Sequence, residues 1–111
     1  MELWQRQSLF ALNVAKLINF IKSKGYNVTL GEAFRTPEQA KIYANEGKGI
    51  VNSLHCKRLA IDLNLITSNG IYLPDDDHYI QFGSYWESLD GFNRWGGHFK
   101  RCDGNHFEMQ D

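Results

Sequence analysis

Hydrophobic residues near the N-terminus recur at the spacing of an amphipathic helix. Asparagine and lysine side chains fall largely off this stripe. Gly25 follows it, and glycine readily adopts the left-handed conformation that ends many helices. The pattern therefore predicts a helix over residues 3–24. The stripe is formed by Phe10, Val14, Leu17 and Ile21, and Ile18 widens it.

Two further stretches have the features of helices. The segment Thr36-Pro37-Glu38-Gln39 combines an N-cap threonine, a proline in the first turn and the spacing of a capping box. It predicts a helix that begins at residue 36 and ends near residue 46. Residues 78–89 also favour a helix, with Tyr79, Phe82 and Trp86 on one side.

Alternating hydrophobic and polar residues predict the strands. Residues 59–66 alternate leucine and isoleucine with Ala60, Asp62 and Asn64, the pattern of a half-buried strand. Ser68-Asn69-Gly70 is a hairpin turn signal. The other predicted strands are residues 26–34, 71–73 and 105–109, and residues 90–97 are rich in turn formers. Together the elements predict an α+β fold, a small, mostly antiparallel sheet packed with helices.

Composition limits the classes of function. With 111 residues, 42% of them hydrophobic, the chain fits one domain over residues 1–111. Its 12 basic and 13 acidic residues give a net charge of −1, so nothing global favours nucleic acid or an anionic membrane as partner. The most apolar N-terminal stretch, residues 9–21, is interrupted by polar residues and resembles neither a signal peptide nor a membrane span.

The two cysteines, Cys56 and Cys102, are too few for a disulfide scaffold. Free thiols are the first interpretation, a disulfide between them the second and zinc ligation the third. Zinc ligation ranks last because the sequence has no Cys-x-x-Cys spacing.

Asp62 is the first residue that suggests chemistry, because an ionised carboxylate in a strongly apolar strand needs a partner or a solvated face. His55 precedes it, and His106 begins the last predicted strand. Imidazole and carboxylate are standard zinc ligands, and a catalytic zinc site holds three protein ligands and an open position for water. Asp103 lies shortly before His106 and could accept a proton from that water.

These residues resemble the motifs of a known family, the peptidoglycan-cleaving zinc peptidases. Ser53-Leu54-His55 followed by Asp62 resembles the first motif, and Asp103 with His106 resembles the second. The family includes D-alanyl-D-alanine carboxypeptidases and dipeptidases of the VanY and VanX type and the phage L-alanyl-D-glutamate endopeptidases. Aspartate at the position of the base is similar to the phage branch. Residues 34–39, 93–97 and 106–108 are also similar to family segments, whereas Arg58 stands where many members carry glycine.

The resemblance implies a hedgehog/D-Ala-D-Ala peptidase-like domain that hydrolyses the peptide stems of bacterial peptidoglycan. The expected target is the L-alanyl-D-glutamate bond, as in a phage or prophage endolysin. The protein is expected to be a monomer that acts on the cell wall after holin-assisted release from the cytoplasm. The implied ligands of Zn²⁺ are His55, Asp62 and His106, the implied general base is Asp103, and Arg35 is expected to stabilise the oxyanion.

Other interpretations of the function stay open. Within the family, a D-alanyl-D-alanine carboxypeptidase or dipeptidase is the alternative. Outside it, a zinc-binding module of hedgehog-like fold without catalysis is one possibility, although the presence of Asp103 and Arg35 argues against it. A small metal nuclease is another, and the absence of a basic stripe argues against that.

Several single residues also have more than one interpretation. Arg35 can pair with Glu32 or Glu38, and Asp103 can be a turn residue before a glycine. Ser53 is expected to support the first ligand or to contact substrate. Tryptophans such as Trp86 and Trp95 are more often core residues than substrate platforms, and Trp95, beside two glycines, is the better candidate for the cleft wall. His78 and His98 are expected to be ordinary surface residues.

Overall fold

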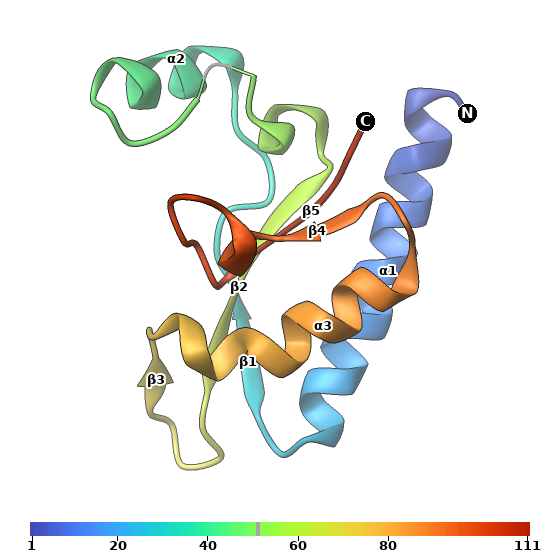
Figure 1. The fold of residues 1–111 in the computed structure, drawn as a ribbon, viewed down its shortest axis with the longest axis vertical. Helices are drawn as coiled ribbons and strands as arrows, with labels where there is room; N and C mark the ends of the chain where they lie inside the picture. Colours follow the sequence, from blue (N-terminus) through green and yellow to red (C-terminus); the bar gives the residue numbers. More distant parts are fainter. Residues whose placement is uncertain (51) are drawn as a thin grey trace.

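The computed structural model describes residues 1–50 and 52–111, and it shows an α+β fold with a mostly antiparallel sheet, as predicted (Figure 1). The α-helices are α1 (Leu3–Ser23), α2 (Pro37–Asn45) and α3 (Ile80–Leu89). The strands are β1 (Asn27–Leu30), β2 (Ala60–Ile66), β3 (Tyr72–Leu73), β4 (Asn93–Trp95) and β5 (His106–Met109). Short 3₁₀ turns are η1 (Leu54–Lys57), η2 (Asp76–Tyr79) and η3 (Gly96–His98).

The sheet brings distant parts of the chain together at its centre. Among the described residues its order is β1-β2-β5-β4, with β3 also paired to β2, and each of these pairs is antiparallel. The last strand, β5, is therefore inserted between β2 and β4. Its register places His106 directly opposite Asp62. Two residues that are 44 positions apart in the sequence thus meet across one strand pair.

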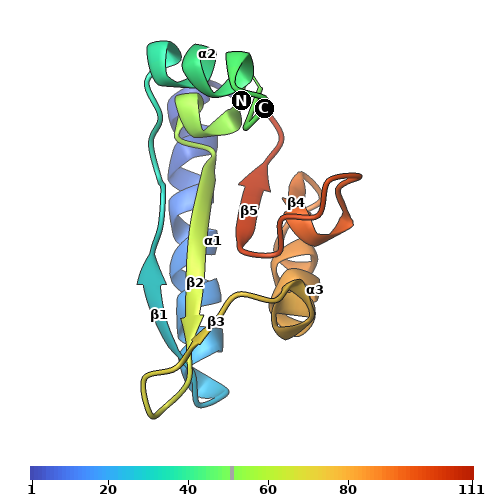
Figure 2. The ribbon, with the colours of Figure 1, turned by 90° about the vertical axis from the view of Figure 1, so that its left-hand side faces the viewer.

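The two faces of β2 are chemically different. Leu59, Leu63 and Leu65 are fully buried and join the hydrophobic core, whereas Asp62 lies on the other face, as the alternation predicted. Figure 2 shows α1 running along β1 and β2, with α3 beside β4. These helices contribute Leu17, Ile21, Phe82 and Trp86 to the core. Because the core occupies one face of β2, the polar residues of the opposite face are available for chemistry.

The helix starts follow the sequence signals. Thr36 caps α2, since its hydroxyl accepts a hydrogen bond of 3.0 Å from the backbone N–H of Gln39. The predicted helix over residues 78–89 begins as the 3₁₀ turn η2 and becomes α-helical only at Ile80. None of the helices within residues 1–50 and 52–111 has both the length and the apolar run that crossing a bilayer requires.

The first strand is shorter than predicted, because β1 ends at Leu30 rather than at Phe34. The next two residues face the single residue Asp62: Gly31 N–H donates to Asp62 O at 2.8 Å, and Asp62 N–H donates to Glu32 O at 2.9 Å. Two residues opposite one is the arrangement of a β-bulge, which bends a strand and redirects its side chains. The bulge brings Glu32 to the polar face of β2.

Residues 90–97 were predicted to be rich in turns, but the structure has strand β4 within them. This strand has only three residues, Asn93–Trp95, and is held by pairing with β5 rather than by its own pattern. Trp86 Nε1 supports both strands, because it lies 3.2 Å from Arg94 O and 3.0 Å from Glu108 O. Such a short strand depends on tertiary contacts that local sequence does not encode.

Candidate metal centre and catalytic cleft

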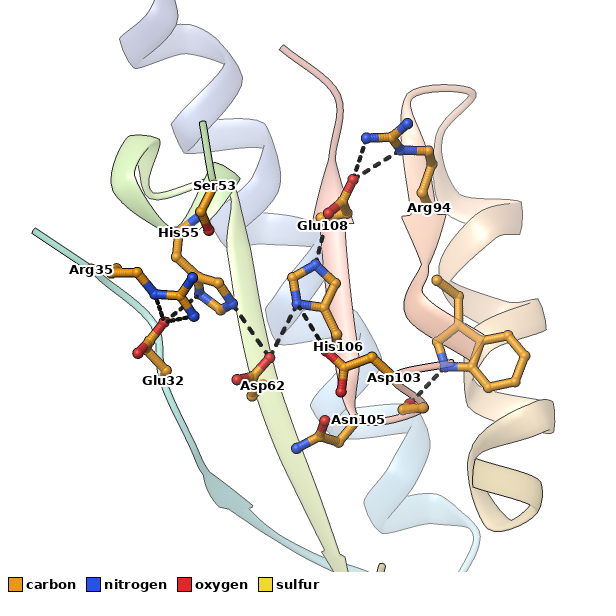
Figure 3. Close-up of polar contacts among 12 residues, drawn as sticks. Glu32, Arg35, Ser53, His55, Asp62, Arg94, Asp103, Asn105, His106 and Glu108 are labelled. Atoms are coloured by element: carbon orange, nitrogen blue, oxygen red, sulfur yellow. Dashed lines mark hydrogen bonds and ion pairs between the residues drawn. The ribbon is translucent and has the colours of Figure 1, made fainter. Parts of the chain in front are cut away.

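The two histidines and the aspartate of the predicted metal site lie together. His55 comes from η1, Asp62 from the middle of β2 and His106 from the start of β5. Each offers one ligand atom, and these atoms all lie within 4.8 Å of one another. In Figure 3 the two imidazole rings point at the same carboxylate.

The distances fit a shared ion. One oxygen, Asp62 Oδ1, lies 3.4 Å from His55 Nε2 and 3.2 Å from His106 Nδ1. Both rings are almost completely buried, with His55 exposed by 2% and His106 by 8%. Three such donors around one point suit Zn²⁺, which favours nitrogen and carboxylate ligands and tolerates an open fourth position.

The outer nitrogen of each ring faces a glutamate. His106 Nε2 lies 2.7 Å from Glu108 Oε1, a hydrogen-bond distance. His55 Nδ1 is buried without a hydrogen-bond partner among the described residues, and Glu32 Oε1 lies 3.7 Å from it. A proton on each outer nitrogen leaves the inner nitrogens free to bind a metal, the usual arrangement around ligating histidines. The donor set therefore fits a zinc ion.

When no metal is bound, the pKa values of Asp62 and His106 depend on each other. Although burial alone would raise the pKa of Asp62, hydrogen bonds and charge interactions with His106 and His55 lower it to about 2. Burial would lower the pKa of His106, but its hydrogen bonds to Asp62 and Glu108 raise it to about 9. In the absence of metal, the proton on His106 therefore compensates the carboxylates around it.

Neither Glu32 nor Glu108 was assigned a role beside the histidines from the sequence, although Glu32 was considered as a partner of Arg35 and residues 106–108 were similar to a family segment. Glu108 could have been found, because residues two apart in a strand point to the same face and His106 is two residues before it. Its carboxylate is buried and also accepts hydrogen bonds from Arg94. Glu32 carried no such signal, since its position depends on the bulge after β1.

Asp103 lies at the edge of the candidate metal centre. Its Oδ2 is 4.0 Å from His106 Nδ1, and the side chain is 55% exposed, so it reaches solvent. Partial burial raises the pKa of Asp103, as do the negative charges of Asp62 and Asp76. A carboxylate with a raised pKa is a better proton acceptor than an ordinary surface aspartate.

Arg35 and Ser53 both adjoin the centre. Arg35 donates from Nε to Glu32 Oε1 at 2.6 Å, so the pairing with Glu32 considered from the sequence is present. The guanidinium also lies 4.9 Å from the ring centre of Tyr43. Ser53 caps η1, because its hydroxyl oxygen accepts a hydrogen bond of 3.2 Å from the backbone N–H of His55. Ser53 thus supports the turn that carries the first histidine.

A cavity of about 500 Å³ opens over these residues. It is large enough for a short peptide segment, and the candidate ligands form part of its lining. The cavity adjoins all the predicted site residues except one. Those that line it are Arg35, Ser53, His55, Asp62, Asp103 and His106.

The exception is Trp95, which was expected at the cleft wall. It is only 4% exposed and belongs to the hydrophobic core. Its indole packs against Gly83 of α3, where there is no room for a Cβ atom. The neighbouring glycines that suggested an open cleft instead let the ring fit against the backbone. Trp95 therefore lies in the core next to the site and does not line the cavity.

The remaining histidines and the cysteines lie outside the metal centre. His98 Nε2 is 3.1 Å from Glu87 Oε1 at the surface, and His78 is exposed, as predicted. Cys56 and Cys102 are free thiols, in agreement with the first interpretation of the sequence. The candidate metal cluster found within residues 1–50 and 52–111 contains neither of them.

Comparison with known proteins agrees with this architecture. The chain is similar in structure to the L-Ala D-Glu endopeptidase ChiX of Serratia marcescens, with a TM-score of 0.70 and 20% sequence identity over 86% of this chain and 77% of that one. At this identity the likeness shows the fold alone. No curated protein matches the sequence. A family model described as D-alanyl-D-alanine carboxypeptidase matches residues 46–109, which is more than half of the chain and includes all three candidate ligands. The chain therefore belongs to the D-alanyl-D-alanine carboxypeptidase family of peptidases.

Proposed function

We propose that this chain is a zinc peptidase that hydrolyses the peptide stems of bacterial peptidoglycan, with the L-alanyl-D-glutamate bond as its target. The observation that carries the proposal is the convergence of His55, Asp62 and His106 within 4.8 Å, in the wall of a cavity that also contains Asp103. Membership in a peptidase family supports the reaction class, and the structural likeness to an L-Ala D-Glu endopeptidase supports the choice of bond.

In the proposed mechanism, a zinc ion and side chains of this protein have different roles. A zinc ion held by His55, Asp62 and His106 would supply Lewis acidity toward the scissile carbonyl and the attacking water. Asp103 accepts the proton of the attacking water and returns it to the leaving amine. Arg35, held at the cavity wall by Glu32, stabilises the charge that develops on the carbonyl oxygen. Glu108 keeps the ring of His106 in the orientation that ligation requires.

The mechanism predicts that Asp103→Ala abolishes hydrolysis while zinc stays bound, because Asp103 is not one of the three ligands. The measurement is the turbidity of purified cell walls, combined with the zinc content of the purified variant. A matched control is His98→Ala, which changes a surface histidine outside the centre. Full activity of Asp103→Ala would remove this residue from the mechanism.

Addition of a chelator tests whether hydrolysis requires a metal, and it distinguishes a zinc peptidase from a metal-independent activity. Hydrolysis should cease with the chelator and return when zinc is added. Loss of turbidity that the chelator does not affect would contradict a zinc peptidase.

The alternative within the family is a D-alanyl-D-alanine carboxypeptidase, which the description of the matching family model favours. Mass spectrometry of the digested stems distinguishes the two. Cleavage between L-alanine and D-glutamate separates the peptide from the glycan, whereas a carboxypeptidase releases free D-alanine and leaves the stem attached.

A further inference from the structure

The loop that carries Asp103 is held by a residue that does not line the cavity, Asp76 of η2. The backbone N–H of Gly104 donates a hydrogen bond of 2.7 Å to Asp76 Oδ1. On the other side of the same glycine, Gly104 O accepts a hydrogen bond of 2.6 Å from Trp95 Nε1. The peptide groups before and after Gly104 are therefore both fixed, directly after Asp103.

The packing around Gly104 is very close. A Cβ atom added to Gly104 would lie 2.6 Å from Asp76 Oδ1 and 2.8 Å from Asp76 Cα. Only glycine lets the two segments approach so closely. Asp103 N–H also donates to Gly96 O at 3.0 Å. Side chain and backbone bonds thus hold the loop from three directions.

The segment that presents Asp76 is itself anchored to the sheet. Tyr79, in the same turn η2, is 1% exposed. Its hydroxyl accepts a hydrogen bond of 3.0 Å from Leu65 N–H of β2 and donates one of 2.9 Å to Leu73 O of β3. A continuous set of contacts therefore leads from the sheet through η2 to the loop of Asp103.

We propose that Asp76 is a positioning residue, whose carboxylate holds the Gly104 peptide and so sets the place of Asp103 over the cavity. The inference rests on the proposed role of Asp103 as general base. A base must lie within hydrogen-bond reach of the proton it accepts, and a displacement of about 1 Å can cost a factor of about 100 in rate. His106 depends less on Asp76, because the β2–β5 pairing and Glu108 hold it.

An acidic residue at this place could also act only as a favourable charge near the N-terminal end of a helical segment. Asp77 shares that position but has no side-chain hydrogen bond among the described residues, so Asp77→Ala is the matched control. Asp76→Asn is the conservative variant, because its amide oxygen can still accept from Gly104 N–H while the charge is lost.

The kinetic test compares these three variants with the unchanged chain on peptidoglycan stem peptides. We expect Asp76→Ala to lower kcat about 10- to 100-fold, with KM and zinc content unchanged. Asp76→Asn and Asp77→Ala should stay within about threefold of the original kcat. Should Asp76→Ala fail to fold, Asp76→Ser replaces it, because serine lacks the carboxylate oxygen that accepts the hydrogen bond from Gly104 N–H.

A second measurement does not need activity. Hydrogen exchange of the Gly104 amide in the metal-free protein should be slow in the unchanged chain and in Asp76→Asn, and faster in Asp76→Ala. Equal protection in all variants, or an unchanged kcat in Asp76→Ala, would overturn the inference. If the unchanged chain hydrolyses no stem peptide, the proposed function fails instead, and the exchange measurement still tests the contact.

Discussion

Glu108 orients the ring of His106, a candidate metal ligand. Its buried carboxylate is hydrogen-bonded to His106 Nε2 at 2.7 Å, and His106 Nδ1 is directed at Asp62. Hydrogen bonds and charge interactions with His106 and Arg94 lower the pKa of Glu108, although burial alone would raise it. The carboxylate is therefore ionised at neutral pH and accepts a hydrogen bond from the ring N–H of His106.

Replacement of Glu108 by alanine should weaken zinc binding about 10- to 100-fold, because the ring of His106 loses its orientation. Glu108→Gln should lose less, since its amide oxygen can still accept the hydrogen bond. Competition with a chromophoric chelator measures both affinities. Glu38→Ala, an exposed carboxylate at the start of α2, is the control. An unchanged affinity in Glu108→Ala would show that His106 needs no such support.

Arg58 is the non-glycine residue with a positive φ among the described residues, at 56°. It closes η1 in the left-handed conformation, directly after the turn that carries His55. The position at which the family resemblance led us to expect glycine is thus one where glycine is conformationally favoured. The guanidinium lies 4.1 Å from the ring centre of Phe34, a contact that partly offsets the strain.

Comparison of two substitutions isolates this backbone strain. Both Arg58→Gly and Arg58→Ala remove the contact with Phe34, but only glycine accepts the left-handed conformation without cost. We expect Arg58→Gly to be more stable than Arg58→Ala by about 1 kcal/mol in urea denaturation. The same pair at Lys57 should rank in the opposite order, because Lys57 belongs to the right-handed turn. Equal stability of the two Arg58 variants would mean that η1 relaxes.

At this scale the sequence predicted the three residues that converge in the candidate metal centre, but not the carboxylates that face their outer nitrogens. His55, Asp62 and His106 could be named because their residue types limit the chemistry and their motifs resemble a family. Glu32 could not be named, because its position depends on the β-bulge that follows β1. Trp95 was misplaced because flanking glycines are compatible with an open cleft and with tight packing alike, and only the tertiary contact with Gly83 decides.

At the scale of elements, α3 and β4 are joined by several hydrogen bonds and by one especially close packing contact. Gly83 of α3 lies against the indole of Trp95, whose Nε1 is fixed by Gly104 O. The ring is buried and cannot move aside without breaking that bond. The helix therefore needs a residue without a side chain here, although glycine is a poor helix former.

Gly83→Ala should destabilise the protein by about 1–3 kcal/mol, the usual cost of overpacking, despite a gain in helix propensity of about 1 kcal/mol. Urea denaturation measures the change. Ser84→Ala is the control on the exposed side of the same helix and should be neutral or slightly stabilising. A stabilised Gly83→Ala would show that Trp95 has space to move.

The elements that the sequence predicted are those with strong local signals. The stripe of α1 and the cap of α2 depend on neighbours in the sequence, and both were found. The end of β1 and the existence of β4 depend on pairing partners far along the chain. Local patterns cannot encode such pairing, so these boundaries were missed.

At the scale of the whole molecule, the candidate metal centre makes the free energy of unfolding depend on pH. His106 has a pKa raised from 6.5 to about 9 in the metal-free fold. Its proton therefore stabilises that fold fully below pH 6.5, and the contribution is lost as pH rises through 9. Asp62, with a pKa of about 2, is already ionised over this range. A metal bound at this site must displace the proton on His106.

Stabilisation by zinc should therefore grow with pH. Between pH 6.5 and 8, zinc competes with one proton for the ring of His106. Each pH unit should therefore raise the affinity for zinc about tenfold, and the increase in the free energy of unfolding caused by zinc should grow by about 1.4 kcal/mol. Thermal or urea unfolding at fixed free zinc, with and without chelator, measures this difference. Asp62→Ala should show little stabilisation by zinc at any pH, because it lacks the central ligand. A zinc increment that does not change with pH would mean that His106 is already neutral before the metal binds, and that the two carboxylates do not hold its proton.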